Sequence, residues 1–458
     1  MSFTPPKPPS RPEKSSLFAY LRAFRKDILS AQPEKLYGAK MAEFKTPFFR
    51  SFLVNQPELV DFVLKERPSE FPKSNRIREG LEPLLGNSVF LTNGAEWERQ
   101  RRIINPAFEG GRLREVLPAM EAASAAMVER LAMRAGDDPV EFEQEASFTA
   151  ADIIFRTLFS IPITHHTASE VFVQFQGFQR TQPILNLAAF LPIPRWVPRF
   201  HRRATIKRAR ALRGLITELV MERAKAIERG DAPDDLATKI MTTKDPQTGN
   251  CFSPAEMVDQ VAIFFLAGHE TSASALAWAM YLLAVDQDMQ RRVQDEIDAQ
   301  VGQGSVSLSK LGKLRLTRDV FQEALRLYPP VPMMVREAQC PHQFRGRNVE
   351  KGAQVVISPW HMQRHTGMWD NPDCFDPDRF KTPEGKAALR KAYLPFSKGA
   401  RVCPGAGFAM AEGPMILAHL LRAFSFSAAD GPKPIPVAHL TVRAKNGIWL
   451  KVTPRKNA

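Results

Sequence analysis

One cysteine near the carboxyl-terminal end of the chain, Cys403, stands in a setting that suits metal or cofactor chemistry. It lies in the ten-residue segment FSKGARVCPG, residues 396–405. Two glycines bracket the cysteine, so the backbone can turn tightly and approach a flat ligand. The apolar run 406–421, although broken by Gly413-Pro414, predicts a helix that begins just after the cysteine. A helix amino terminus favours the thiolate, which is the form of cysteine that ligates metals.

An acid–alcohol pair, Glu270-Thr271, interrupts a long apolar stretch. Ser253 and Glu256 form a capping box around Pro254, which predicts a helix from residue 254 to about residue 286. A glutamate at the midpoint of such a helix is costly to bury unless it has partners or contacts water. Thr271 can bond the carbonyl one turn back or hold a water. From the helix alone, a satisfied polar cluster in the core is as good an interpretation as a functional site. The flexible Gly268 permits a local opening of the helix at this point.

Composition sets the class of protein. The chain has 458 residues, of which 44% are apolar and 24% charged, with a net charge of +14. These values are typical of a globular protein and exclude a disordered chain, a collagen-like fibre and a multi-pass membrane protein. Helical patterns dominate, and strand-like runs occur mainly within residues 48–64 and as a hairpin over 344–359. The sequence therefore predicts a mainly α fold with a minor β-sheet region.

Two further expectations concern the amino terminus and the remaining cysteines. Residues 1–20 form a Pro-rich segment that predicts a flexible leader, and 21–458 form a single large domain. Without a signal peptide or a spanning segment, a cytoplasmic protein is expected. The spacing of Cys251, Cys340 and Cys374 argues against a metal held only by cysteines and against a disulfide framework. Each of these three is expected to be a small buried hydrophobe.

Segment 396–405 resembles the haem-binding loop of the cytochrome P-450 monooxygenases, Phe-x-x-Gly-x-Arg-x-Cys-x-Gly. The fixed positions are matched by Phe396, Gly399, Arg401, Cys403 and Gly405. Four other segments resemble family motifs in the right order: Trp97-x-x-x-Arg101, the central-helix signature AGHET at 267–271, Glu323-x-x-Arg326, and Pro377-Asp378-Arg379-Phe380. The resemblance covers nearly the whole chain.

The resemblance implies haem b, iron protoporphyrin IX, with Cys403 as the axial iron ligand. It implies that Trp97, Arg101 and Arg336 lie near the haem propionates, and that Phe396, Gly399, Arg401 and Gly405 shape the cofactor site. Glu270 and Thr271 are then the proton relay of catalysis. Glu323, Arg326 and Arg379 are expected to form a buried network that supports the haem loop.

Taken without the family, some of these residues have simpler interpretations. On a helical wheel Arg326 falls beside Asp319 and Gln322, which predicts a surface ion pair with Glu323 worth about 0.2–0.5 kcal/mol. Trp97 and Arg101, at i and i+4, suit a carboxylate ligand but also fit an ordinary amphipathic turn.

The implied activity is insertion of one oxygen atom from O2 into a lipophilic small molecule. The candidate pocket residues are Phe264, Phe265, Ala267, Val331, Met333, Met334 and the stretch 81–90. Segment 184–200, rich in Leu, Phe, Trp and Pro, resembles the mobile lid over the entrance in this family. The aromatic and Met side chains among these candidates are equally compatible with core packing.

Electrons must come from another protein, because one haem domain uses the whole length and leaves no flavin or iron–sulfur module. We expect an acidic ferredoxin-type donor with its reductase, so that NAD(P)H acts only indirectly. The basic residues that surround the cysteine loop in sequence are Lys381, Lys386, Arg390, Lys391 and Lys398. They are equally consistent with an ordinary solvated surface.

The sequence also bears on other partners and activities. No nucleic-acid module is found, and membrane contact is at most peripheral, through the basic lid segment. Two other activities stay open: a thiolate-haem peroxygenase or isomerase, and a haem sensor or carrier without turnover. The intact Glu270-Thr271 pair argues against the first.

Overall fold

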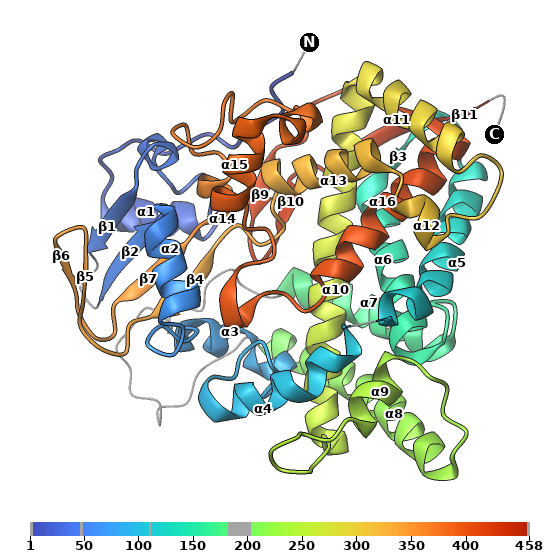
Figure 1. Ribbon diagram of the computed structural model, residues 1–458, viewed down its shortest axis with the longest axis horizontal. Coiled ribbons are helices and arrows are strands. Elements are labelled where there is room, and N and C mark those ends of the chain that lie inside the picture. The colour runs from blue at the N-terminus through green and yellow to red at the C-terminus, as the bar shows by residue number, and fades with distance from the viewer. Residues whose placement is uncertain (1–2, 46–48, 110, 182–202, 456–458) are drawn as a thin grey trace.

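Helix α10 (Pro254–Val285), 32 residues long, runs through the centre of the molecule and organises the fold (Figure 1). Ser253 accepts a hydrogen bond from the Glu256 amide, and the Glu256 side chain accepts one from the Ser253 amide. This is the predicted capping box, and the predicted helix is confirmed. α10 packs against α6 (Phe142–Phe159), α8 (Arg203–Arg229), α13 (Arg315–Leu327) and α16 (Ala406–Ala423).

The computed structural model describes residues 3–45, 49–109, 111–181 and 203–455. The remaining described α-helices are α1 (Leu17–Phe24), α2 (Pro57–Asp61), α3 (Asn75–Leu85), α4 (Gly94–Ile104), α5 (Arg112–Ala132), α7 (His166–Thr181), α9 (Leu236–Thr242), α11 (Gln287–Gln300), α12 (Leu308–Leu311), α14 (Pro359–Met362) and α15 (Pro383–Ala392). Short helical turns occur at η1 (Glu34–Tyr37), η2 (Phe62–Glu66), η3 (Asn105–Ala107), η5 (Pro377–Lys381) and η6 (Gly399–Arg401).

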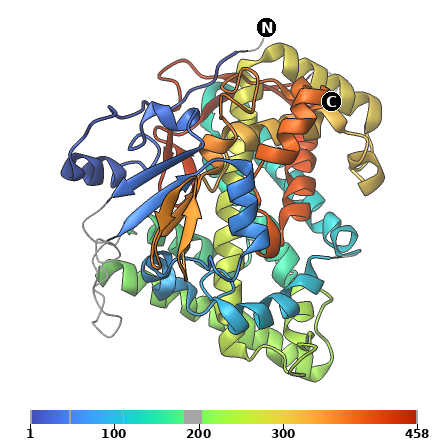
Figure 2. The ribbon, with the colours of Figure 1, turned by 60° about the vertical axis from the view of Figure 1, so that its left-hand side comes forward.

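The main sheet lies beside the helical body and has the strand order β1-β2-β7-β4 (Figure 2). Its strands are β1 (Met41–Lys45), β2 (Arg50–Val54), β7 (Gln354–Ile357) and β4 (Met334–Glu337). Only β2 and β7 pair in parallel, with Phe52 opposite Val355. Three smaller sheets are formed by β3 (Gly136–Glu141), β11 (Trp449–Pro454) and β8 (Phe424–Ala428); by β5 (His342–Phe344) and β6 (Arg347–Val349); and by β9 (Pro436–Ala438) and β10 (Val442–Ala444). The fold is thus mainly α with minor β, as predicted.

The hairpin expected over residues 344–359 is only partly correct. Its turn falls at Arg345-Gly346, where both residues have positive φ, and joins β5 to β6. Residues 354–357 instead form β7 and pair with β2, about 300 residues earlier in the chain. The alternation of polar and apolar residues predicts a strand here, but it cannot reveal a partner strand at that separation in the chain.

Gly268 has a different purpose from the helix opening that its flexibility suggested. α10 is continuous through this residue. A Cβ atom at position 268 would lie 2.4 Å from Cδ1 of Ile154 on α6. The glycine therefore allows α6 and α10 to approach closely, and the expected opening is absent from α10.

Residues 3–7, expected to be part of a flexible leader, lie against the body of the protein. The Phe3 ring packs 5.8 Å from the Phe375 ring, and the buried Tyr328 hydroxyl donates to the Pro6 carbonyl at 2.8 Å. Lys7 forms an ion pair with Asp373 at 2.9 Å. Anchors from distant parts of the chain thus order a segment whose own composition suggested freedom.

Among the described residues, no helix is both long enough and apolar enough to cross a bilayer.

Candidate functional site

The Cys403 loop is a tight structure held by its own backbone. The Cys403 amide donates to the Phe396 carbonyl at 2.9 Å, and the Val402 amide donates to the Gly399 carbonyl at 3.0 Å. Gly399 has φ of +69°, and a Cβ atom there would lie 2.0 Å from the Leu64 carbonyl oxygen of η2. Glycine is therefore required at 399, both by the left-handed backbone and by the close approach of η2.

Gly405 meets no comparable obstacle. A Cβ atom at this position would have the Cys403 sulfur, 3.9 Å away, as its nearest neighbour. Gly405 is the amino-terminal cap of α16, and its amide donates to the sulfur. Space therefore remains beside the thiol on the side of α16.

An accessible stripe on α10 marks a space inside the fold. Most of this helix is buried, yet Ala267 is exposed and Phe264, Gly268 and Thr271 are partly exposed. These positions follow the i, i+3, i+4, i+7 spacing of one helix face. The Cys403 side chain is likewise accessible. The Phe108 ring bridges α10 and α16 through tilted ring contacts, lying 5.8 Å from the Phe264 ring and 5.2 Å from the Phe408 ring of α16.

Four cations lie close together near the thiol, Lys73, Arg101, Arg336 and Arg401, and two of them, Lys73 and Arg101, act directly on the charge of Cys403. Arg401 stacks over the Trp97 ring at 4.1 Å and donates to the Asn93 side chain at 2.7 Å. Arg101 donates to the Val402 carbonyl at 3.1 Å, so both predicted members of α4 contact the cysteine loop.

The four cations lack a counter-charge. Within the described part of the chain, none of them forms an ion pair with a carboxylate, and Nη1 of Arg401 is buried with no partner. Burial, with the guanidiniums of Arg336 and Arg101, lowers the pKa of Arg401 to about 9. Burial also lowers the pKa of Arg336, to about 10. Because an uncompensated buried cation is costly, this cluster favours binding of an anion.

Lys73 is a member of the cation cluster that the sequence did not reveal. Its ammonium donates to the Phe90 carbonyl at 2.7 Å. Burial, with the charges of Arg336, Arg401 and Arg101, holds its pKa well below the usual value. It lies opposite Arg336 in an isolated β-bridge, a long-range pairing with no signal in local spacing.

The thiol itself is not ionised by its surroundings alone. The accessible sulfur faces a space that protein encloses, and this desolvation raises the pKa of Cys403, an effect that the Gly405 amide, Arg101 and Lys73 only partly offset. The amino terminus of α16 thus favours the thiolate, as expected, but the desolvation of Cys403 outweighs this effect. Metal coordination is what converts such a thiol to thiolate.

Glu323, Arg326 and Arg379 form a buried network, and the surface ion pair suggested by the helical wheel is wrong. Arg326 makes two hydrogen bonds to the Glu323 carboxylate, at 2.7 and 2.8 Å, and Arg379 donates to the same carboxylate at 3.0 Å. Glu323 and Arg326 have 0% exposed side chains because the segment 363–379 covers them.

Gln363 connects this network to the cysteine loop. Its amide nitrogen donates to the Leu325 and Arg326 carbonyls at 2.9 Å, and its oxygen accepts from the Leu394 amide at 2.7 Å. The Ser397 amide in turn donates to the Leu394 carbonyl at 3.2 Å. A chain of buried hydrogen bonds therefore fixes the start of the loop on the network.

Glu270 and Thr271 point into different surroundings. The Thr271 hydroxyl lies on the accessible stripe and donates to the Ala267 carbonyl at 2.5 Å. Glu270 is buried, accepts from the Thr441 hydroxyl at 2.7 Å and lies 3.3 Å from Arg443. Both partners come from the β9–β10 region, which sequence patterns did not connect with α10.

Arg443 continues this polar cluster toward solvent. It lies 3.9 Å from Glu143 and is 38% exposed. Burial, aided by Glu141 and Glu270, raises the pKa of Glu143 to about 7 although Arg443 opposes the shift. The neighbouring His269 is buried against Ser147 and three aromatic rings, and burial lowers its pKa to about 3. His269 is therefore neutral.

The predicted pocket residues separate into two groups. Phe264 and Ala267 lie on the accessible stripe, and Val331 and Met333 are partly exposed. The prediction that Phe265 lines the pocket is wrong, because this residue is 2% exposed and packs on Phe155 and Phe175 in the core.

The remaining pocket candidates are also divided. Met334 packs on the hydrophobic core of the main sheet. In the stretch 81–90, Leu81, Leu84 and Leu85 are core residues. The expected lid, 184–200, lies outside the described residues.

The chain matches the cytochrome P-450 family model over residues 5–452. It belongs to the cytochrome P-450 family. Cyclooctatin synthase of Streptomyces melanosporofaciens is 30% identical over 86% of this chain and 84% of its own length. Human cytochrome P-450 4A11 is 31% identical (83% and 76%), and mouse cytochrome P-450 4A10 is 32% identical (83% and 77%). The protein is therefore a haem-thiolate monooxygenase, an oxidoreductase that incorporates oxygen.

The described residues fit a haem of this cytochrome P-450. A haem carries two carboxylates, which match the four cations without a carboxylate partner. The accessible Cys403 sulfur would supply a thiolate ligand, and the accessible stripe of α10 would leave room for a bound group.

Glu323→Gln is expected to destabilise the protein by about 3–5 kcal/mol, because it leaves two buried guanidiniums without a carboxylate. Haem content should fall as the stability falls, since Gln363 connects the network with the cysteine loop. Urea unfolding and haem quantification measure both effects. As a control, Arg292→Ala removes an exposed pair with Asp378 and should cost less than about 1 kcal/mol. Equal effects of the two substitutions would contradict the assignment.

Proposed function

We propose that Cys403 is the axial ligand of haem b and that this cytochrome P-450 hydroxylates a lipophilic small molecule. The observation that supports the site most directly is the convergence of Lys73, Arg101, Arg336 and Arg401, none paired with a described carboxylate, beside an accessible thiol. The four cations would hold the propionates, and Trp97 would fix Arg401 by stacking. Phe396, Gly399 and Gly405 would set the shape of the loop.

When bound, the thiolate-ligated haem supplies reductive cleavage of dioxygen, which consumes protons. Thr271 presents its hydroxyl on the accessible stripe, where it can orient a water and pass it a proton. The carboxylate of the neighbouring Glu270, which accepts a hydrogen bond from Thr441, is a proton acceptor on the buried side of α10. Arg443 and Glu143 connect Glu270 with the surface, and a Glu143 carboxyl with pKa near 7 can exchange protons at neutral pH.

The accessible residues around this space support a lipophilic substrate. Phe264, Ala267, Val331 and Met333 offer apolar surface. Thr271 adds one hydroxyl to this stripe of α10, whereas His269 and Glu270 are buried on other faces of the helix. Binding of an apolar compound there would be driven by burial, with orientation left to a few polar groups.

Thr271→Ala should keep haem and substrate binding but reduce product formed per electron pair by at least about tenfold. Electrons would be diverted into peroxide, because the hydroxyl that orients the proton donor is gone. Consumption of reductant, peroxide and product are measured together. Thr271→Ser, which keeps the hydroxyl, should retain most of the coupling. Unchanged coupling in Thr271→Ala would remove Thr271 from the relay.

We further propose that an acidic ferredoxin, reduced by its NAD(P)H-dependent reductase, docks on α15. Lys386, Arg390 and Lys391 are exposed on this helix, and no described carboxylate forms an ion pair with them. Two other expected members contribute less: Lys381 pairs with Asp378, and Lys398 is 14% exposed beside Asp61. The α15 residues also lie close in the chain to the cysteine loop, which favours electron entry on this side.

Charge reversal at Lys386, Arg390 and Lys391 together should raise the KM for an acidic ferredoxin by at least about tenfold and flatten its dependence on ionic strength. The haem spectrum and substrate binding should not change. Lys225→Glu on α8, which lies far from α15 in Figure 1, is the matched control. An equal effect of both variants, or reduction insensitive to ionic strength in the parent, would contradict docking on α15.

A further inference from the structure

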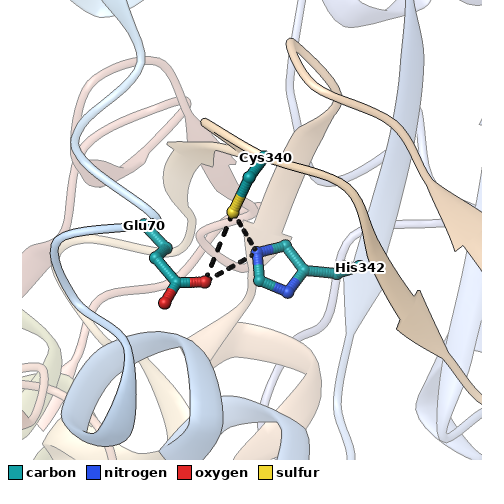
Figure 3. A group of neighbouring side chains, drawn as sticks. All are labelled: Glu70, Cys340 and His342. Carbon is teal, nitrogen blue, oxygen red and sulfur yellow. Dashed lines mark hydrogen bonds and ion pairs between the residues drawn. The ribbon is translucent and has the colours of Figure 1, made fainter.

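Three potential metal ligands lie together beside the main sheet, away from the cysteine loop: Glu70, Cys340 and His342 (Figure 3). Glu70 lies between η2 and α3, whereas the other two lie on the connection from β4 to β5 and on β5 itself. The Cys340 sulfur is 3.3 Å from Nε2 of His342 and 3.4 Å from Oε2 of Glu70. Nε2 of His342 is 3.2 Å from the same carboxylate oxygen.

We propose that these three side chains bind a zinc ion, with water as its fourth ligand. Zinc bonds of about 2.3 Å to sulfur and about 2.0–2.1 Å to nitrogen or oxygen place tetrahedral ligands about 3.4–3.6 Å apart. The three observed separations are within a few tenths of an ångström of that range. Thiol, imidazole and carboxylate together select zinc over magnesium or calcium, which prefer oxygen ligands alone.

The donors are held in place before any ion binds. Arg67 binds the other oxygen of Glu70 at 2.9 Å, which directs Oε2 toward the cluster. The His342 ring lies 4.5 Å from the Phe71 ring and contacts the Phe62 ring edge-on. Such outer contacts fix the orientation of metal ligands and reduce the ordering that binding requires.

The Cys340 S–H donates to the Glu70 carboxylate, so the thiol already points at a second donor of the cluster. Zinc would replace this proton, forming a Zn–S bond and releasing one H⁺ to solvent.

Zinc at this position would cross-link two backbone segments, 70–73 and 336–340, whose hydrogen-bonded ladder reaches the cation cluster. The Gln339 amide donates to the Glu70 carbonyl at 2.9 Å, and the Glu337 amide donates to the Pro72 carbonyl at 3.0 Å. One step further along, Lys73 is opposite Arg336. The ion would close the open end of the ladder and stabilise the fold in proportion to its occupancy.

The haem-loaded protein, dialysed against micromolar zinc held by a chelator buffer, should retain one zinc per chain. X-ray absorption at the zinc edge should show one sulfur at about 2.3 Å and nitrogen or oxygen ligands at about 2.0–2.1 Å. Zinc should also raise the thermal unfolding temperature of the parent.

Cys340→Ser and Glu70→Gln should each weaken zinc binding by at least tenfold and abolish the thermal shift, with unchanged haem spectrum and circular dichroism. Cys251→Ser, which alters another partly exposed cysteine, should bind zinc like the parent. Absence of retained zinc, a zinc shell without sulfur, or undiminished binding by Cys340→Ser would overturn the proposal.

Discussion

The gathering of four positive charges beside one thiol is the constraint on which the rest of this structure depends. Burial lowers the pKa of Lys73, Arg336 and Arg401, and neighbouring cations lower the pKa of Lys73 and Arg401 further, so the polypeptide alone holds the cluster at a cost in free energy. The two carboxylates of a haem would offset that cost, and Cys403 would ligate its iron. Cofactor binding would then help to complete the fold, and haem retention should follow the integrity of the cluster.

The buried Glu323 network explains how the cysteine loop keeps its shape beside this charge. Two arginines share one carboxylate, and Gln363 carries the connection to Leu394 at the start of the loop. Gly399 lets the loop rest on η2. Buried hydrogen bonds and the contact with η2 thus hold the cysteine loop. In contrast, α10 has accessible side chains and a polar connection to the surface through Arg443.

Sequence patterns predicted the parts of this arrangement that are local. The capping box fixed the start of α10, and the ten residues around Cys403 indicated the family and the ligand. Patterns failed where distant segments meet: Lys73 beside Arg336, Thr441 and Arg443 behind Glu270, and β7 beside β2. The helical wheel placed Arg326 at the surface because it could not show that segment 363–379 covers that face. The prediction for Phe265 failed for the same reason: the sequence does not show that Phe264 faces the accessible side of α10 while Phe265 faces the core.

Iron-edge X-ray absorption of the haem-loaded protein, compared with Cys403→Ser, tests the central claim most directly. The account predicts one sulfur in the coordination shell of the iron in the parent and none in the variant, with a changed visible spectrum. An iron shell of nitrogen and oxygen alone in the parent, or identical spectra for the two proteins, would contradict it.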